Sequence, residues 1–406
     1  MSEPQQTLGL QQAIDLAIQH HTAGRLSQAE TIYQQILQTD PHANYLAHRA
    51  EIDAAVQRVL DSGWYILGKE VDAFEREFAD FVGTAYAVGV ASGTDALKLA
   101  LLACGVGVGD LVFTVSHTAV ATVAAVELTG ATPVLVDIDP LSYSMDVDCL
   151  RAVLHNHPAG RPRAVVPVHL YGHPADMDAI CHLAEEHGLF VVEDCAQAHG
   201  AIVDGRSVGT WGQLAAFSFY PTKNLGAFGD GGAVVSGNSE LAETVRGLRE
   251  YGWRERYVSE TPGDNSRLDP LQAAILRAKL PHLEFENARR RSHARRYQEL
   301  LVDSEIGLPA ARSDVHHVYH QFVVRTKQRN RLHEHLRDCG VSSAIHYPVP
   351  VHRQPAYAGR VLTAGELVHS DAAAGEILSL PMYPELMPVA VDTVAQHILE
   401  WSGLNQ

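Results

Sequence analysis

The stretch FSFYPTKNLGAFGDGG, residues 217–232, places a single lysine, Lys223, between an aromatic strand-like run and a glycine-rich loop. A lysine that is removed from water at such a position can have its pKa lowered toward neutrality, because burial disfavours the charged form. A neutral lysine is a nucleophile that can form a Schiff base with a carbonyl compound. Most lysines are simply solvated, so this stretch alone does not decide between a chemical role and none.

The stretch VVEDCAQAHG, residues 191–200, brings Asp194 to the end of an apolar, strand-like run. Burying an acid at such a place is costly unless the acid is paired. The pyridine nitrogen of pyridoxal phosphate (PLP) needs such a carboxylate, because protonation of that nitrogen makes the ring an electron sink. An aspartate that caps the following helix would explain the same residue equally well.

The stretch SGTDA, residues 92–96, follows another strand-like run and opens a helix-like one. A helix N-terminus offers free backbone N–H groups and a partial positive charge, and Gly93 would let a phosphate approach the backbone closely. Many strand-to-helix turns look like this one. The stretch is neither a dinucleotide fingerprint nor a Walker A sequence, because it lacks the glycine spacing of both.

The spacing of the three stretches joins them into one predicted site. Asp194 and Lys223 are 223 − 194 = 29 residues apart, as expected for the ends of two successive strands. Their side chains could then reach opposite parts of a single flat cofactor. Together, the lysine, the acid and the phosphate-binding turn predict a PLP site.

Short apolar runs alternate with helix-like segments over most of the chain. This alternation predicts a mostly parallel sheet covered on both faces, with ligands bound beyond the carboxyl ends of the strands. After residue 237 the pattern is helical to about residue 300 with a break at Pro281, and later strands are expected near residues 320–325 and 342–349. The expected strands of the main sheet include residues 111–116, 132–138, 164–170, 189–194 and 215–220.

These patterns predict three parts of the chain. They are a helical hairpin at residues 1–43, a PLP-binding large domain at 44–285 that begins with a helical segment at 44–80, and a small C-terminal α+β domain at 286–406. The hairpin resembles one tetratricopeptide repeat, and a single repeat cannot bury its own apolar face. It is therefore expected to pack on the main body, to contact a partner protein, or to be the remnant of a longer array.

The composition restricts the function further. The chain has 406 residues and a formal net charge of −17, which disfavours nucleic-acid binding because such proteins carry a basic face. The five cysteines are widely spaced without a C-x-x-C pair, which indicates thiols in a reducing compartment. No signal peptide or bilayer-spanning run is visible, so we expect a cytoplasmic protein without membrane contact. The 23 histidines are scattered, and no metal site is expected.

With these motifs, the chain resembles the sugar-nucleotide aminotransferases of PLP fold type I, the group that includes DegT and StrS. The resemblance extends from about residue 47 to residue 388. It implies an α/β fold like that of aspartate aminotransferase, with a mainly parallel seven-stranded sheet between helices and a smaller α+β domain. The motifs that carry it are GWYILG (63–68), VASGTDALKLAL (90–101), VHLYGHPADMDAI (168–180), VEDCAQAHG (192–200), FSFYPTKNLGAFGDGG (217–232), NSRLDPLQAAIL (265–276) and HYPVPVHRQPAY (346–357).

The resemblance implies a role for each matching residue. Lys223 would form the Schiff base and shuttle a proton between the substrate and the cofactor, and Asp194 would hold the ring nitrogen. Gln197 would contact the ring hydroxyl, and the ring of His117 would stack on the cofactor. Gly93, Thr94 and Ser218 would bind the phosphate, together with Asn265 of the partner subunit.

The resemblance also implies a sugar pocket and a homodimer with shared active sites. Segments that contain Trp64, Tyr65, His346 and Tyr347 would line that pocket. The dimer follows from the expected contribution of Asn265 of the partner subunit to the phosphate site. The N-terminal repeat-like segment departs from the group, which leaves the structure of residues 1–46 open.

The implied reaction transfers an amino group from L-glutamate to a nucleotide-linked keto-sugar, with PLP converted to pyridoxamine 5'-phosphate during the cycle. The segment KNLGAFGDGG is similar to the branch that acts on 3-keto sugars, so a dTDP-3-keto-6-deoxyhexose is the expected acceptor and a 3-amino-3,6-dideoxyhexose the product. A UDP-linked 3-keto sugar or an NDP-linked 4-keto sugar is the alternative. A non-catalytic docking or regulatory protein on the same fold is a more distant alternative, supported only by the N-terminal repeat.

Overall fold

The computed structural model describes residue 39, residues 41–310 and residues 314–403. The predicted hairpin of residues 1–43 lies outside these residues except for its last few positions. The described part begins with three helices, α3 (Pro41–Ala47), α4 (Arg49–Ser62) and α5 (Lys69–Val82). They occupy the segment in which the sequence predicted helices before the first strand.

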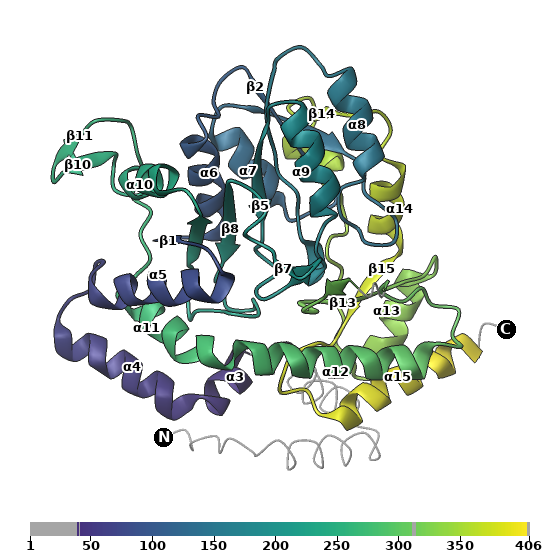
Figure 1. Cartoon of the computed structure of the whole chain (residues 1–406). Coiled ribbons are helices and arrows are strands. Elements are labelled where there is room, and N and C mark those ends of the chain that lie inside the picture. Colours follow the sequence, from purple (N-terminus) through teal and green to yellow (C-terminus); the bar gives the residue numbers. More distant parts are fainter. Residues whose placement is uncertain (1–38, 40, 311–313, 404–406) are drawn as a thin grey trace.

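An eight-stranded sheet forms the centre of the molecule (Figure 1). Every neighbouring pair is parallel except the two pairs that contain β9. The seven strands expected from the family resemblance are joined by a short eighth, β14, whose two residues are too few for a recognisable sequence pattern. In spatial order the strands are β1 (Tyr86–Val90), β9 (Gly232–Ser236), β8 (Leu214–Ser218), β5 (Phe190–Asp194), β4 (Arg161–Val165), β2 (Asp110–Val115), β3 (Thr132–Val136) and β14 (Leu362–Thr363).

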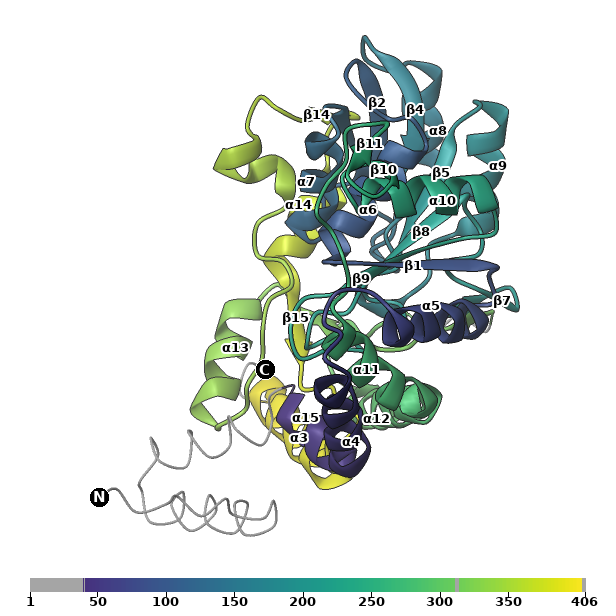
Figure 2. The same cartoon turned by 90° about the vertical axis from the view of Figure 1, so that its left-hand side faces the viewer.

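Helices cover both faces of the sheet (Figure 2). Alternate side chains of a strand point to opposite faces, so Val112 packs into the cluster beneath α6, α7 and α10, whereas its neighbour Phe113 packs into the cluster beneath α8 and α9. Burial on both faces explains the continuous apolar runs in the sequence. These helices are α6 (Gly93–Ala103), α7 (Val120–Leu128), α8 (Val147–His155), α9 (Met177–Glu186) and α10 (Ser239–Leu248).

The C-terminal part is built on a second, smaller sheet. Strand β13 (Phe322–Arg325) pairs antiparallel with β15 (Ile377–Leu380), and one apolar cluster joins this pair to α12, α13 and α15. Helices α12 (Leu283–Leu301) and α15 (Pro388–Gly403) lie side by side (Figure 1). The other helices of this part are α13 (Arg329–Asp338) and α14 (Val368–Glu376).

Two sequence expectations in this region had different outcomes. The predicted break at Pro281 is confirmed, because a short 3-10 turn, Leu280–His282, separates α11 (Pro270–Lys279) from α12. The strand expected near residues 342–349 was wrong: only Ala344 makes a bridge, to Ser379. Pro348 and Pro350 have no N–H group to offer a strand partner, which explains why this apolar segment does not join the sheet.

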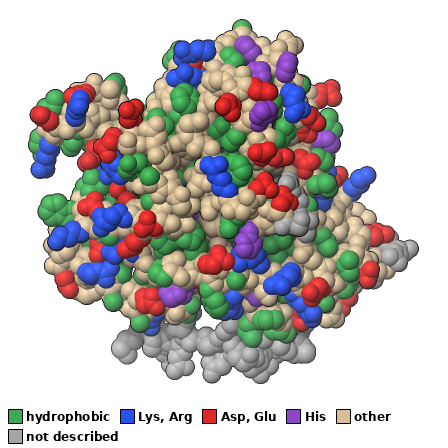
Figure 3. Space-filling model, in the orientation of Figure 1, with side chains coloured by type: hydrophobic (Ala, Val, Ile, Leu, Met, Phe, Trp, Pro, Cys, Tyr) green, Lys and Arg blue, Asp and Glu red, His purple; other side chains and the backbone are tan. Residues whose placement is uncertain are grey.

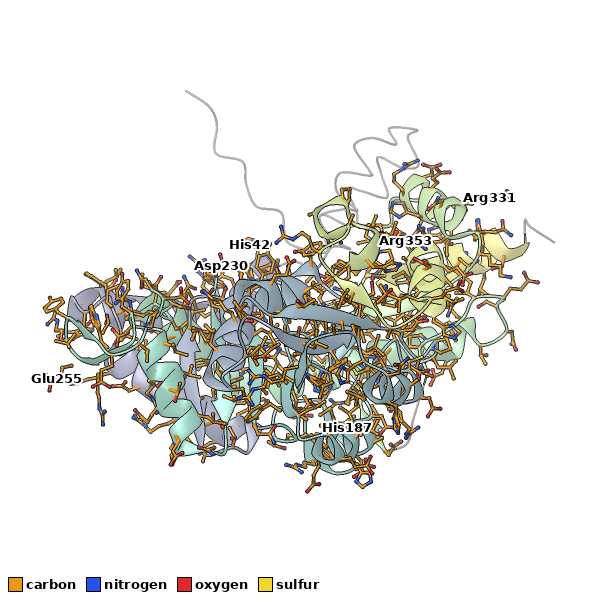
Figure 4. The ribbon with its side chains drawn as sticks, turned by 90° about the horizontal axis from the view of Figure 1, so that it is seen from above. His42, His187, Asp230, Glu255, Arg331 and Arg353 are labelled. Carbon is orange, nitrogen blue, oxygen red and sulfur yellow. The ribbon has the colours of Figure 1, made fainter. Side chains whose placement is uncertain are left out.

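A hairpin projects from the body of the molecule. Strands β10 (Trp253–Glu255) and β11 (Val258–Ser259) form it, and it stands away from the sheet in Figure 1. Glu255 lies at the outer edge of the molecule in Figure 4. A hairpin with so little of its own chain around it is suited to contact another molecule. A third small sheet joins β6 (Ile202–Val203), β7 (Arg206–Ser207) and β12 (Val315–His316).

The surface carries charges of both signs. On the face shown in Figure 3, acidic and basic side chains are interspersed, and neither sign covers a continuous area. Within the described residues, no helix is both long enough and apolar enough to cross a bilayer.

Candidate active site

A cavity of about 350 Å³ lies beyond the carboxyl ends of the parallel strands. The segments that follow β1, β2, β4, β5 and β8 form one side of it, and residues of the C-terminal part form the other. This is where ligands bind in open α/β sheets. Among the residues predicted for the site, the cavity is lined by Gly93, Thr94, Asp194, Gln197, Ser218, Lys223, His346 and Tyr347.

Lys223 lies in the loop between β8 and β9 and lines the cavity half-buried. Burial lowers the pKa of Lys223 to about 8, and the negative charge of Asp194 acts in the opposite direction. Among the described residues, none accepts a hydrogen bond from its Nζ. The side chain is therefore an amine that has a pKa close to neutral pH and that lines the cavity.

Asp194 is the last residue of β5, and its side chain is 5% exposed. Its Oδ2 accepts a hydrogen bond from the hydroxyl of Thr122 at 2.8 Å, and its Oδ1 accepts one from the backbone N–H of Ala196 at 3.1 Å. Burial raises the pKa of Asp194, because both donors are neutral and do not replace the lost water. The carboxylate therefore lacks a directly bonded cation.

The N-terminus of α6 meets the end of β8 at one corner of the cavity. Ser92 caps the helix, and its Oγ accepts a hydrogen bond from the backbone N–H of Asp95 at 3.1 Å. A Cβ at Gly93 would lie 2.6 Å from Cβ of Ser218, so only glycine permits this approach. Gly93, Thr94 and Ser218 thus gather free N–H groups and a hydroxyl at a helix N-terminus, which is an anion site.

Gln197 joins the two sides of the cavity. Its Oε1 accepts a hydrogen bond from the backbone N–H of Tyr171 at 2.7 Å, and its Nε2 donates to the hydroxyl of Tyr347 at 3.1 Å. His346 lies beside Tyr347, with its Nδ1 2.9 Å from Oγ of Ser379. These contacts bring His346 and Tyr347 to the cavity although their segment forms no strand.

His117 does not reach the cavity wall. Its side chain is fully buried, and its Nε2 lies 2.8 Å from the hydroxyl of Tyr171. Burial lowers the pKa of His117 to about 4. The cavity is lined instead by the following residues, Thr118 and Ala119. The ring of His117 therefore lies behind the cavity wall in this structure.

Three predicted residues lie away from the cavity of their own chain. Trp64 and Tyr65 follow α4 and are 64% and 50% exposed. The indole N–H of Trp64 donates to the backbone carbonyl of Ile66 at 2.9 Å. Asn265 lies at the base of the projecting hairpin, where it forms a bridge with Glu250. None of the three lines the cavity in the described chain.

Comparison with known proteins decides the family. Residues 47–399 match the sequence pattern of the DegT/DnrJ/EryC1/StrS aminotransferase family. The chain belongs to this family. The match covers all the cavity residues described above and leaves out only the N-terminal segment and the last few residues.

Individual relatives match the sequence of this aminotransferase over nearly their whole length. The dTDP-3-amino-3,4,6-trideoxy-alpha-D-glucose transaminase of Streptomyces venezuelae is 50% identical over 377 residues, which are 93% of this chain and 98% of that protein. The erythromycin biosynthesis sensory transduction protein EryC1 of Saccharopolyspora erythraea is 50% identical over 356 residues, 87% of this chain and 96% of that protein.

A solved structure gives the same result. The crystal structure of S. venezuelae DesV in complex with a ketimine intermediate superposes with a TM-score of 0.86 at 50% identity and covers 89% of this chain and 97% of that one. The predicted family, the α/β fold class and the assignment as an aminotransferase are thereby confirmed.

The residues on the wall of this aminotransferase fit PLP. A protonated ring nitrogen would supply the cation that the buried carboxylate of Asp194 lacks. The corner at Gly93 and Ser218 would hold a phosphate, and the amine of Lys223 opens onto the same cavity. The donors are thus of the right chemical kinds for each end of the cofactor.

Thr122 and His320 are among the wall residues of the aminotransferase that had not been singled out in the sequence. The hydroxyl of Thr122 donates to Asp194 and lies 2.9 Å from the hydroxyl of Thr118, four residues earlier. The pair of threonines spaced four apart after a predicted strand was the available signal. His320, from the segment before β13, also lines the cavity and had no signal in its surroundings.

Proposed function

We propose that this aminotransferase moves the amino group of L-glutamate to a dTDP-linked 3-keto-6-deoxyhexose and releases a 3-amino-3,6-dideoxyhexose on the nucleotide. The observation that carries the proposal is the cavity in which a near-neutral lysine and a buried carboxylate face the same space. The 3-amino sugar in the name of the Streptomyces venezuelae relative supports the choice of carbon.

In this proposal the chain's residues hold the cofactor and move one proton. PLP, when bound, supplies an electron sink for the charge left when a proton leaves the substrate carbon. Asp194 would hold the ring nitrogen, Gln197 would contact the ring hydroxyl, and the corner at Gly93, Thr94 and Ser218 would bind the phosphate. Lys223 would take the proton from the substrate carbon and deliver it to the cofactor, which its pKa of about 8 permits near neutral pH.

We further propose a homodimer in which each subunit completes the site of the other. Trp64, Tyr65 and Asn265 do not line their own cavity, and the hairpin beside Asn265 projects from the body (Figure 1). In the dimer, Asn265 of the partner subunit reaches the phosphate, and the exposed segment at residues 63–68 faces the sugar. The division into a large domain at 44–285 and a small one at 286–406 is part of the same proposal, although residue 286 lies inside α12.

The test is the visible absorption spectrum of the purified protein before and after addition of L-glutamate. We expect a yellow band that bleaches with L-glutamate, and its return on addition of a dTDP-3-keto-6-deoxyhexose. If the yellow band returned only with a UDP-linked 3-keto sugar or an NDP-linked 4-keto sugar, the proposed acceptor would change, but the proposed transamination would stand. A protein that stays colourless after incubation with PLP would contradict the proposal and favour a docking role.

A further inference from the structure

The ring of His320 has two nitrogens in different surroundings. The side chain is 5% exposed and lines the cavity on the side opposite the strand ends. Its Nδ1 lies 3.1 Å from Oδ1 of Asn224, the residue after Lys223. Its Nε2 has no hydrogen-bond partner among the described residues and is left to the cavity. One nitrogen is therefore engaged within the protein, and the other is available to what the cavity holds.

The amide of Asn224 determines which nitrogen carries the hydrogen. Nδ2 of Asn224 donates to the backbone carbonyl of Val318 at 3.0 Å and to Oδ1 of Asn287 at 2.8 Å. Because a backbone carbonyl can only accept, the orientation of the Asn224 amide is set and its Oδ1 is an acceptor. Nδ1 of His320 must then donate to it. A neutral imidazole has a single N–H, so Nε2 carries a lone pair.

The ring of His320 is neutral at neutral pH. Burial holds the pKa of His320 well below its usual range, and the charges of other groups act in the same direction. The groups that act in this direction are Lys223, Arg290, His346 and His199. The Nε2 of His320 is therefore an uncharged hydrogen-bond acceptor in the cavity that also holds the unpaired amine of Lys223.

We propose that, during turnover, when the substrate has released Lys223 from the cofactor and its Nζ is protonated, Nε2 of His320 accepts a hydrogen bond from that Nζ across the cavity that both residues line, which makes His320 a positioning residue for the lysine. This inference rests on the proposed transamination. When Lys223 takes a proton, the C–H bond of the substrate breaks, an N–H bond forms, and the electron pair stays with the substrate and its cofactor. His320 takes no proton. Its hydrogen bond from a charged donor, a strong class, stabilises the ammonium group and directs Nζ.

A pair of substitutions separates this role from a structural one. In His320→Asn, the amide nitrogen can occupy the place of Nδ1 and still donate to Asn224, but nothing replaces Nε2. In His320→Gln, the longer side chain can place its Oε1 where Nε2 was, while the bond to Asn224 is lost. The measurement is the rate of bleaching by L-glutamate in a single turnover, recorded as a function of pH.

The proposal predicts that His320→Asn slows this half-reaction by about tenfold or more, as expected for loss of a hydrogen bond to a charged group. In this variant, the rising limb of the plot of bleaching rate against pH should also move to lower pH. The ammonium group loses a stabilising acceptor, so the pKa of Lys223 falls. His320→Gln should recover most of the rate. The opposite order, with His320→Asn close to wild type and His320→Gln impaired, would show that only the bond to Asn224 matters and would overturn the proposal.

A second measurement does not depend on turnover. Nitrogen NMR of the imidazole groups of the purified enzyme, with His320→Asn used to assign the signal, reports the tautomer directly. We expect a neutral ring protonated at Nδ1 between about pH 6 and 9. A ring protonated at Nε2, or a charged ring, would overturn the inference even in an active enzyme. A wild-type protein that does not react with L-glutamate would instead refute the proposed function.

Discussion

Two lysines, one in the loop between β8 and β9 and one in the helix beside it, have nearly the same pKa and different surroundings. Burial lowers the pKa of both Lys223 and Lys279 to about 8. Lys279, at the end of α11, is 5% exposed, and its Nζ donates to the backbone carbonyl of Gly226 at 2.5 Å. It also lies 5.7 Å from the ring centroid of Phe228. Lys223 has no such partner and faces the cavity.

The comparison shows that a lowered pKa does not by itself identify a reactive lysine. The amine of Lys279 is held by the loop that carries Lys223, so it contributes to the shape of that loop, and the cavity of about 20 Å³ that it lines is too small for a substrate. The amine of Lys223 has no hydrogen-bond acceptor among the described residues and lines the cavity of about 350 Å³. Access to a cavity large enough for a substrate, together with a carboxylate on its wall, distinguishes the candidate chemical lysine from the structural one.

The largest expected difference between the two lysines is in turnover. Lys223→Ala should lower the rate of transamination by at least about a thousandfold, because the group that moves the proton is removed. Lys279→Met, which removes the other near-neutral amine, should retain most of the rate. Steady-state assays with L-glutamate and a keto-sugar nucleotide measure both. Equal losses in the two variants would contradict a distinct chemical role of Lys223.

The next effect is a dependence of stability on pH. The pKa of Lys279 is about 8 in the folded protein against an ordinary value of 10.5, so the unfolded chain binds more protons between these values and stability rises with pH across that window. The shift of 10.5 − 8 = 2.5 corresponds to about 3 kcal/mol. In urea unfolding, the free energy of unfolding of the wild type should therefore rise relative to that of Lys279→Met by up to about 3 kcal/mol between about pH 8 and 10.5.

Parallel stability curves for the two proteins over this range would show that Lys279 does not titrate as its burial implies. The comparison is made as a difference between variants because other groups, including Lys223, titrate in the same range and cancel. Below about pH 8, the wild type is destabilised by the buried charge of Lys279, and the variant is destabilised by the unsatisfied carbonyl of Gly226. The two effects offset each other, so the difference in the free energy of unfolding should be small there.

The smallest expected effect concerns the carboxylate across the cavity from Lys223. Thr122→Val removes a hydroxyl that donates to Asp194 at 2.8 Å and should weaken PLP binding by about tenfold, because a hydrogen bond to a charged group is lost. Thr129→Val is the matched control: its hydroxyl is also buried but donates only to the carbonyl of Val126 in the same helix. Titration of cofactor-free protein with PLP measures both. Similar losses in both variants would contradict a specific role of Thr122.

Much of the site was predictable because it lies at strand ends. Runs such as residues 189–194 and 215–220 are apolar on both faces, and their carboxyl ends meet at one edge of a parallel sheet wherever the helices lie. Asp194, Ser218 and Lys223 follow from that rule together with the helix that opens at Gly93. The structure brings these residues to one cavity.

The misplaced residues lie where a side chain could point either way. His117 follows β2, and whether it or Ala119 faces the cavity depends on the turn of the chain between the strand and α7. The apolar run at residues 342–349 reads as a strand, but its prolines leave it to line the cavity. The direction of the His117 side chain and the absence of a strand at residues 342–349 both depend on a few residues outside regular helices and strands. A periodic pattern of apolar residues therefore could not have predicted either.

The amino-acid sequence by itself determined the family, the alternation of strands and helices, and the chemical kinds of the groups at each strand end. These depend on local patterning and on residue types. Only the tertiary structure decided which of two lysines lines the larger cavity, which histidine nitrogen is free, and which donors hold Asp194. Those properties arise from contacts between segments far apart in the chain, such as Asn224 with His320, and burial changes the pKa of a group only once those segments have packed around it.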